Sequence, residues 1–164
     1  MPSHILIGPM GVGKSTVGAE LAKALNTPFI DTDRVIEERS GKSVSDIFIE
    51  DGETAFRAKE EDVLIETLKQ DGVLALGGGA CVSERAQDAL QKSGAQIIFL
   101  DISLAEVSKR VGFDQARPLL ALNPRTKWQE LMEKRRSIYE SLASKHILVD
   151  GKSVSDIVSE IGGV

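Results

Sequence analysis

A glycine-rich segment near the start of the chain carries the clearest chemical signal. Residues 8–15 read GPMGVGKS, which satisfies the pattern G-x-x-x-x-G-K-[ST], and they lie between an apolar run and a segment of helical periodicity. Glycines in such a turn let backbone N–H groups converge on phosphate oxygens, and the following helix adds its positive dipole end. In this pattern Lys14 reaches the β- and γ-phosphates and Ser15 ligates Mg²⁺. The segment predicts a nucleoside triphosphate site with Mg²⁺ as cofactor.

Two carboxylates could complete the magnesium site. Asp101 follows the apolar run 97–100, as the magnesium-binding acid does in many P-loop proteins, whereas Asp31 ends the shorter run 28–30. Both positions suit a ligand, because the carboxyl ends of parallel strands are where ligands collect in an open sheet. The pattern alone does not separate Asp31 from Asp101.

A second site is indicated by an arginine in acidic surroundings. Residues 33–66 hold eleven acids and five bases, and Arg57 is one of the few cations there. Glu60 lies four residues from both Phe56 and Leu64, on an apolar helix stripe where an unpaired carboxylate is costly. Arg57 is its natural partner at this spacing, and an oriented arginine can present a rigid fork to a substrate carboxylate or phosphate. A purely structural ion pair fits the pattern equally well.

The region from residue 109 to 136 has the opposite charge balance, with eight bases and three acids. Such a segment in an acidic chain is a candidate for handling phosphate. Residues 111–124 have the composition of a mobile lid, and Arg117 stands just before Pro118; closure would exclude water and bring a cation to the transferring phosphoryl group. In the next helix Arg135 falls within the apolar stripe, whereas Arg136 lies towards its flank. A guanidinium on a core face needs an anionic partner, from the protein or from a ligand.

These candidates need a scaffold, and short apolar runs alternate along the chain with segments of helical periodicity. Strands are expected at 4–7, 28–30, 73–76, 96–100 and 146–149. Helices are expected at 14–25, 34–40, 45–69 with a break at 51–52, 83–92, 104–110, 125–143 and from 153 onwards. Strands that alternate with helices predict a parallel sheet covered on both faces, so the fold class is α/β.

Composition excludes several classes of protein. The 164 residues predict a single domain, 1–164, with an ordinary globular composition of 41% hydrophobic and 27% charged residues. A net charge of −5 argues against a nucleic-acid partner. The single cysteine, Cys81, excludes an internal disulfide, and the chain shows no signal peptide and no run long enough to cross a membrane. We expect a cytoplasmic protein, and a monomer.

The class of nucleotide enzyme can be narrowed further. Guanine specificity usually needs an Asn-Lys-x-Asp loop, and neither Asn26 nor Asn123 begins one, which argues against a GTPase switch. A P-loop at residue 8 of so short a chain suits a small-metabolite or nucleotide kinase better than a motor ATPase.

Several motifs in a fixed order make the chain resemble the shikimate kinases over essentially its whole length. They are GPMGVGKST at 8–16, DTD at 31–33, DIFIEDGETAFRAKE at 46–60, LGGG at 76–79, RPLL at 117–120 and LMEKRRSIY at 131–139. The resemblance implies a five-stranded parallel sheet in the order 2-3-1-4-5, with helices on both faces, as in nucleoside-monophosphate kinases. It also implies that ATP phosphorylates the 3-hydroxyl of shikimate, a step of aromatic amino acid (chorismate) biosynthesis.

The resemblance also assigns residues to the acceptor and the metal. It places Mg²⁺, through water, at Asp31 beside Ser15, and it gives Asp33 the acceptor hydroxyls and the proton that leaves as the phosphoryl group moves. Arg57, steadied by Glu60, and Arg135 would grip the shikimate carboxylate. Backbone N–H groups of Gly78 and Gly79 would face the acceptor, whose binding region spans about 33–61.

For the nucleotide, the resemblance implies that Lys14 and the lid residue Arg117 stabilise the transferring charge, and that Arg110 and Pro118 flank the adenine. The chain departs from the family at 150–153, which is short and lacks the arginine that some members place beside adenine; Lys152 could substitute for it in part. The full set of expected ATP contacts is Gly11, Val12, Gly13, Lys14, Ser15, Thr16, Arg110, Arg117, Pro118 and Lys152.

Two alternatives stand beside this hypothesis. Gluconate kinases share the size and the P-loop, but they usually follow the acids of the second strand with a histidine, and here Arg34 and Val35 follow Asp33. A catalytically silent kinase-like domain would be expected to have lost one of four residues. All four remain in the chain: Lys14, Asp31, Asp33 and Arg117.

Overall fold

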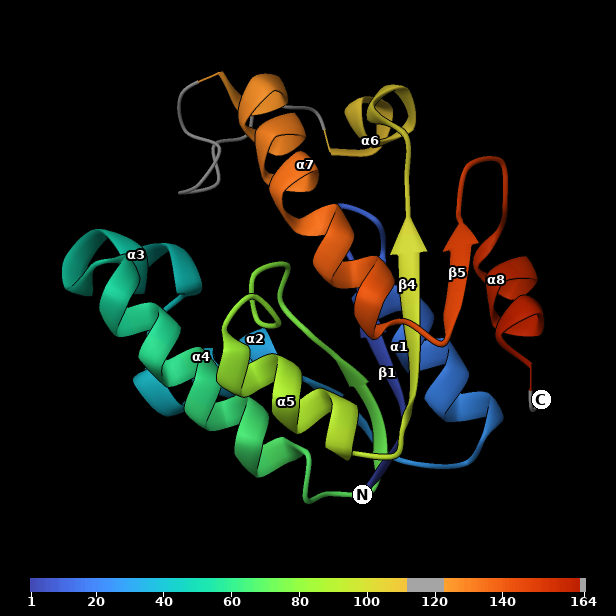
Figure 1. The fold of residues 1–164 in the computed structure, drawn as a ribbon, viewed down its shortest axis with the longest axis horizontal. Helices are drawn as coiled ribbons and strands as arrows, with labels where there is room; N and C mark the ends of the chain where they lie inside the picture. The colour runs from blue at the N-terminus through green and yellow to red at the C-terminus, as the bar shows by residue number, and fades with distance from the viewer. Residues whose placement is uncertain (112–122, 163–164) are drawn as a thin grey trace.

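The apolar runs form one parallel sheet in the computed structural model, which describes residues 1–111 and 123–162 (Figure 1). Every strand pairs in parallel with its neighbours, in the order β2-β3-β1-β4-β5. The strands are β1 (Pro2–Ile7), β2 (Phe29–Asp31), β3 (Gly72–Ala75), β4 (Gln96–Asp101) and β5 (Lys145–Leu148). The predicted strand order is confirmed, and parallel pairing brings all five carboxyl ends to one edge of the sheet.

Helices connect the strands and cover the sheet on both sides. They are α1 (Lys14–Ala24), α2 (Thr32–Ser40), α3 (Val44–Asp51), α4 (Glu53–Thr67), α5 (Glu84–Lys92), α6 (Leu104–Val111), α7 (Pro124–Leu142) and α8 (Val154–Ile161). In Figure 1, α5 and α7 lie in front of the sheet, whereas α1 lies behind it beside α8. None of the helices in the described ranges combines the length and the apolar character that crossing a bilayer requires.

Two boundaries near the expected sites have clear physical causes. The helix predicted at 34–40 begins two residues earlier, because the Asp31 carboxylate accepts hydrogen bonds from the backbone N–H groups of Asp33 (3.0 Å) and Arg34 (3.3 Å) and so caps α2. The break predicted at 51–52 is confirmed. Gly52 stands between α3 and α4 with φ +88°, a conformation that favours glycine.

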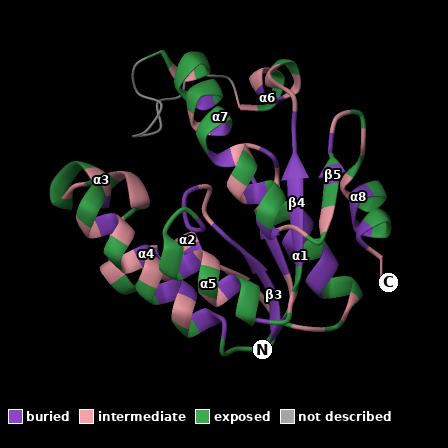
Figure 2. Cartoon of the chain, viewed as in Figure 1, coloured by how far each residue is buried: buried purple, intermediate pink, exposed green. Residues whose placement is uncertain are grey.

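The core divides into a large and a small cluster of buried side chains (Figure 2). The large cluster surrounds the central strands, where Ile5, Leu6 and Ile7 of β1 are at most 1% exposed. The small cluster joins α2, α3 and α4 and consists of Ile36, Ile47, Phe56 and Val63. The helices that follow β2 therefore have an apolar core of their own beside the sheet edge where the strands end.

Candidate active site

The predicted P-loop runs from the end of β1 to α1 and packs tightly against β4. Gly8 has φ +145°, and a Cβ there would lie 2.3 Å from the backbone oxygen of Leu100, so only glycine fits. Lys14 Nζ donates to the backbone oxygens of Gly8 (2.7 Å) and Pro9 (2.9 Å), which folds its side chain back over the loop. The loop borders a pocket of about 230 Å³ that Gly11, Gly13, Lys14, Ser15, Thr16 and Asp31 help to line. Val12, also expected to contact ATP, is buried and does not line this pocket.

The two candidate magnesium carboxylates have different surroundings. Ser15 Oγ donates to Asp31 Oδ2 at 2.6 Å, and both residues line the P-loop pocket. Hydroxyl and carboxylate oxygens are ligands that Mg²⁺ prefers, and Mg²⁺ commonly uses one or two protein groups and keeps several waters. Asp101 instead receives two hydrogen bonds from Arg136, at 2.8 and 3.1 Å. The Ser15–Asp31 pair is therefore the set of donors that fits the metal.

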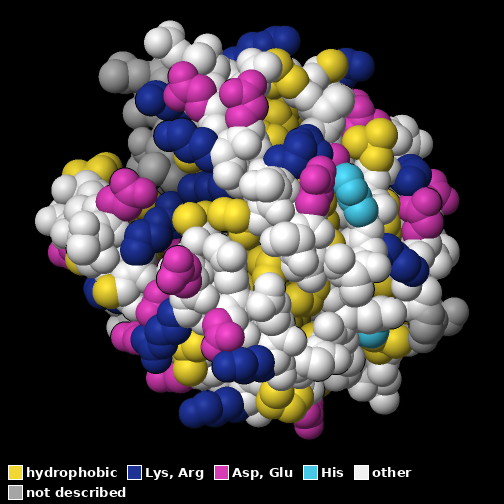
Figure 3. Space-filling view, viewed as in Figure 1, with side chains coloured by type: hydrophobic (Ala, Val, Ile, Leu, Met, Phe, Trp, Pro, Cys, Tyr) yellow, Lys and Arg dark blue, Asp and Glu magenta, His cyan; other side chains and the backbone are white. Residues whose placement is uncertain are grey.

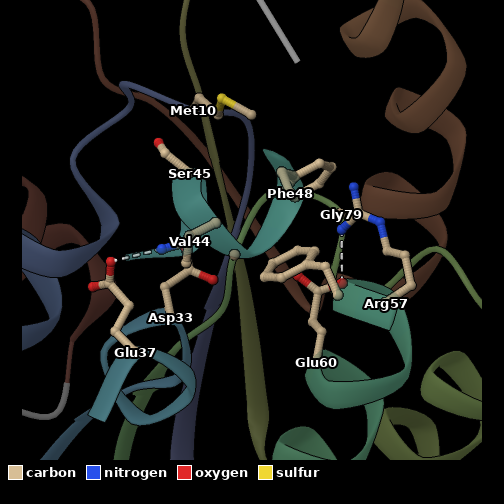
Figure 4. A pocket seen from close by; sticks show the side chains of 12 residues that line it. Met10, Asp33, Glu37, Val44, Ser45, Phe48, Arg57, Glu60 and Gly79 are labelled. Carbon is tan, nitrogen blue, oxygen red and sulfur yellow. Dashed lines mark hydrogen bonds and ion pairs between the residues drawn. The ribbon is translucent and has the colours of Figure 1, made fainter. Parts of the chain in front are cut away.

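A second pocket, of about 340 Å³, adjoins the P-loop pocket (Figure 4). Its lining comes from the P-loop, from the helices that follow β2 and from the glycine loop 77–79 that follows β3. The lining residues are Met10, Asp33, Glu37, Val44, Ser45, Phe48, Phe56, Arg57, Glu60, Gly77, Gly78 and Gly79. Four of them also line the P-loop pocket: Met10, Asp33, Gly77 and Gly78. The two pockets therefore meet at Asp33 and the glycine loop.

Asp33, in the first turn of α2, has a carboxylate oxygen without a partner. Its Oδ1 is buried and accepts no hydrogen bond from the described part of the chain. Burial raises the pKa of Asp33, and the nearby Asp31 carboxylate raises it further. A Cβ on Gly77 would lie 2.7 Å from Oδ1, so glycine makes room for this carboxylate. A buried acceptor that lacks a donor is costly, and a ligand hydroxyl in either pocket could supply the donor.

The predicted Arg57–Glu60 pair is confirmed on α4. Arg57 Nη1 lies 2.7 Å from Glu60 Oε1, and Glu60 is 3% exposed. Burial raises the pKa of Glu60 even though the Arg57 charge opposes this shift. The guanidinium also lies over the rings of Phe48 and Phe56, with its carbon 5.8 and 5.2 Å from their centroids. Arg57 is thus oriented by an acid and two rings at the wall of the pocket.

The two arginines in the middle of α7 face different surroundings, as the helical pattern predicts. Arg135 is 9% exposed, whereas the Arg136 side chain is 40% exposed. Within the described ranges, no acidic side chain comes within ion-pair distance of Arg135. Arg135, Arg57 and Gly79 line a further pocket of about 320 Å³. A buried guanidinium without a carboxylate favours an anion from a ligand. Lys and Arg side chains also gather along the hollow between α3 and α7 (Figure 3).

The glycine loop fits closely between these side chains. A Cβ on Gly79 would lie 2.4 Å from Arg57 Nη1, and one on Gly78 would lie 3.4 Å from Arg135 Nη1. The Tyr139 hydroxyl donates to the Gly78 oxygen at 2.6 Å and ties the loop to α7. The loop therefore holds its backbone beside both arginines.

Four further residues are expected to contact the nucleotide, and the structure describes two of them. Arg117 and Pro118 lie outside the described residues, as does most of the predicted lid at 111–124. Arg110 Nε lies 3.2 Å from Glu106 on α6, and Lys152 lies 2.9 Å from Glu160 on α8. Their contacts with ATP stay predictions.

Two residues that line the second pocket are not among those expected from the sequence. Glu37 lines it and accepts a hydrogen bond from the Val44 backbone N–H at 2.9 Å, which ties α3 to α2 (Figure 4). Its position four residues after Asp33, on the same helix face, was a usable signal. Met10 lines both pockets, and its backbone oxygen accepts from Trp128 Nε1 at 2.9 Å. No local pattern marks the contact of Met10, because Met10 and Trp128 are 118 residues apart.

Comparisons with known proteins agree with this geometry. The sequence model of the family described as "Shikimate kinase" matches residues 10–163. The chain is 45% identical to the shikimate kinase of Rhodococcus jostii over 162 residues, which cover 98% of this chain and 95% of the relative. It is 49% identical to that of Thermobifida fusca over 144 residues, 87% of this chain and 83% of the relative.

Solved structures show the same relationship. A shikimate kinase from Acinetobacter baumannii in complex with shikimate superposes with a TM-score of 0.92 at 34% identity, over 98% of this chain and 90% of that one. A gluconokinase from Sinorhizobium meliloti has a TM-score of 0.60 at 20% identity, over 97% of this chain and 88% of that one, and so shares the fold alone. The chain belongs to the shikimate kinase family.

Proposed function

We propose that this kinase transfers the γ-phosphoryl group of ATP to the 3-hydroxyl of shikimate, with ADP and shikimate 3-phosphate as products and Mg²⁺ held beside Ser15 and Asp31. The observation that carries the proposal is the position of Asp33. This residue lines both the P-loop pocket and the second pocket of about 340 Å³, which we call the acceptor pocket. Its buried Oδ1 lacks a donor among the described residues. An acceptor hydroxyl bonded to Asp33 would stand beside the phosphate-binding loop.

The P-loop residues would hold and neutralise the triphosphate. Phosphoryl transfer asks the protein mainly for in-line positioning and for stabilisation of charge on the transferring group. Lys14 and the backbone N–H groups of residues 11–16 would bind the phosphate oxygens. Mg²⁺ supplies charge neutralisation on the β- and γ-phosphates when it is bound. Asp33 would orient the attacking hydroxyl and accept its proton.

The acceptor carboxylate would lie between Arg57 and Arg135. Arg57 has two carboxylates beside it, Glu60 and, at 3.7 Å, Glu53. Arg135 has none within ion-pair distance among the described residues, so it would supply the positive charge that the ligand carboxylate neutralises. Arg57 is already oriented by Glu60 at 2.7 Å, so its fork would lose little conformational freedom on binding. The backbone N–H groups of Gly78 and Gly79 would add hydrogen bonds from the loop between the two arginines.

The remaining assignments stay proposals. We propose that Arg117 approaches the transferring phosphoryl group when residues 111–124 close, and that Arg110, Pro118 and Lys152 contact the adenine side of ATP. We propose further that the enzyme is a cytoplasmic monomer that needs neither nucleic acid nor a membrane.

A coupled assay for ADP release tests the reaction directly. We expect turnover with ATP, Mg²⁺ and shikimate, and none with gluconate or without an acceptor. Omission of Mg²⁺ should abolish turnover, and a mass measurement of the product should show a single phosphoryl group on shikimate. Turnover with gluconate but not with shikimate would overturn the proposed acceptor. Binding of ATP without turnover on either acceptor would favour a catalytically silent domain.

A further inference from the structure

Asp101, the carboxylate that the metal site does not use, is bonded to the helix that carries Arg135. Arg136 of α7 donates to both of its carboxylate oxygens, at 2.8 and 3.1 Å, and His146 Nε2 of β5 lies 2.9 Å from Oδ2. Asp101 is 8% exposed and stands at the end of β4. Although burial opposes it, these bonds lower the pKa of Asp101 and keep the carboxylate charged. The end of β4 is thus joined to α7 by a bidentate ion pair.

Phe99, two residues earlier on the same face of β4, packs against the same set of side chains. Its ring centroid lies 5.1 Å from that of Tyr139 and 4.4 Å from that of His146. The Arg136 guanidinium carbon lies 5.8 Å from the Phe99 centroid. One face of β4 therefore contacts α7 through a ring and a carboxylate.

Contacts on one side of a helix restrict its rotation about its own axis. Successive residues are about 100° apart around a helix, so a fixed Arg136 also fixes the direction in which Arg135 points. A rotation of about 10° would move an atom about 5–6 Å from the axis by about 1 Å. A displacement of this size at a group that binds substrate can change rates by about 10²-fold. The hydrogen bond from Tyr139 to Gly78 holds α7 on the side that carries Arg135, since Tyr139 follows Arg135 by one turn. The Arg136–Asp101 pair holds the helix at its flank.

We propose that Asp101, acting through Arg136, is a positioning residue that sets the rotation of α7 and thereby directs Arg135 towards the acceptor carboxylate. The inference rests on the proposed role of Arg135 in binding shikimate. It assigns to Asp101 a function on the acceptor side of the site, although the sequence pattern places this residue where many P-loop proteins hold the metal.

Steady-state kinetics of Asp101→Asn and Arg136→Met test this inference. We expect each variant to raise the shikimate KM about 5- to 10-fold and to leave the ATP KM within about twofold, as for other directly coupled pairs. The double variant should be no worse than Arg136→Met, because that single variant already removes the contact that Asp101→Asn weakens. Shikimate binding measured by calorimetry should weaken by the same factor.

Two matched controls separate positioning from general stability. His146→Phe keeps a ring against Phe99 and removes the contact of His146 Nε2 with Asp101 Oδ2. The ion pair between Asp101 and Arg136 remains. Lys127→Gln breaks the 3.6 Å surface pair with Glu130 on α7. Both controls should leave the shikimate KM within about twofold of wild type, even where the melting temperature falls.

Each other outcome has a distinct meaning. A rise in the ATP KM of Asp101→Asn at limiting Mg²⁺ would make Asp101 a magnesium ligand and overturn the inference. An equal effect from His146→Phe would show that Asp101 acts through β5. An unchanged shikimate KM in Arg136→Met, while Arg135→Met raises it, would overturn the positioning role but leave the proposed function intact. Absence of shikimate turnover in the wild type would instead overturn the proposed function. If Asp101→Asn does not fold, Arg136→Met alone tests the inference. The Arg136 side chain is partly exposed, so we expect its replacement to be tolerated.

Discussion

The nucleotide side and the acceptor side of this active site are built in different ways. On the nucleotide side, one continuous segment supplies a backbone that is locked against the sheet: Gly8 leaves no room for a Cβ beside the Leu100 carbonyl. On the acceptor side, side chains of α2, α3 and α4 line one pocket beside the glycine loop, and Arg57 of α4 and Arg135 of α7 line the next one. A phosphate site can be made from local backbone geometry, whereas a site for a shaped organic acid needs side chains from several directions.

The two sides also differ in how their charges are partnered. On the nucleotide side, Ser15 Oγ donates to Asp31 at 2.6 Å. Lys14 Nζ donates to two backbone oxygens of the P-loop at 2.7 and 2.9 Å. On the acceptor side Asp33 Oδ1 has no donor within the described ranges, and Arg135 has no carboxylate there. A buried acceptor without a donor and a buried guanidinium without a carboxylate are costly in the free protein and favour a ligand that satisfies them. Variants on the two sides should therefore affect different kinetic constants.

Lys14→Ala should have the largest effect and should break the nucleotide side alone. Loss of a cation from the phosphates removes stabilisation of the transition state, so we expect kcat to fall on the order of 10³-fold. Circular dichroism should show an unchanged fold. The matched control is Lys23→Ala, an exposed lysine in the last turn of the same helix, which should keep full activity. Retained turnover in Lys14→Ala would refute the assignment of the P-loop.

Arg135→Met should break the acceptor side alone. The variant lacks the cation that would pair with the shikimate carboxylate in a buried site. We therefore expect the shikimate KM to rise about 10²-fold and the ATP KM to stay nearly unchanged. Lys134→Met, its exposed neighbour on α7, serves as the control and should behave as wild type. If Arg135→Met raised both KM values equally, the arginine would not belong to the acceptor clamp.

The same difference explains how much of the site the sequence predicts. The P-loop was predictable because its residues are consecutive and its function depends on backbone conformation. The Arg57–Glu60 pair was predictable because its residues are three apart on one helix. The choice between Asp31 and Asp101 was not, because both end strands at the same edge of the sheet. It depends on contacts with Arg136 and His146, which are 35 and 45 residues away from Asp101.

The fold shows a similar limit. Alternating apolar and helical patterns were sufficient for the α/β class and for nearly all the elements, because burial on both faces of a parallel sheet leaves a strong signal. The strand order came from the family resemblance, since apolar runs do not specify their neighbours. The start of α2 was placed too late, because the capping contacts of Asp31 depend on side-chain geometry at the end of β2.

Two glycine substitutions sharpen the comparison at a smaller scale. In Gly79→Ala the new Cβ meets the guanidinium at the end of the Arg57 side chain, which can shift where a backbone atom cannot, so the protein should fold and the shikimate KM should rise about tenfold. In Gly8→Ala the Cβ meets a backbone oxygen of a central strand, at a φ that alanine rarely adopts. We expect the melting temperature to fall only in Gly8→Ala. A large loss of stability in Gly79→Ala with an unchanged KM would show that its loop does not shape the acceptor site.

The smallest effect should come from the pH dependence of stability at Glu60. Burial raises the pKa of this carboxyl above its unfolded value of about 4.5, so the native state binds its proton more tightly than the unfolded state does. The contribution of Glu60 to stability is therefore complete below pH 4.5 and is lost as the pH rises through the raised native pKa.

The reference for this measurement is Glu60→Gln, which cannot titrate, so that the other groups cancel in the difference. Denaturant unfolding of both proteins from pH 4 to 8 should show the wild-type free energy of unfolding fall relative to Glu60→Gln, by at most about 1.4 kcal/mol per pH unit. The difference should level off once Glu60 is ionised in the native state. A difference that grows in favour of the wild type as the pH rises would mean that the Arg57 charge outweighs burial. The acceptor side would then resemble the nucleotide side, with its charges fully partnered before any ligand arrives.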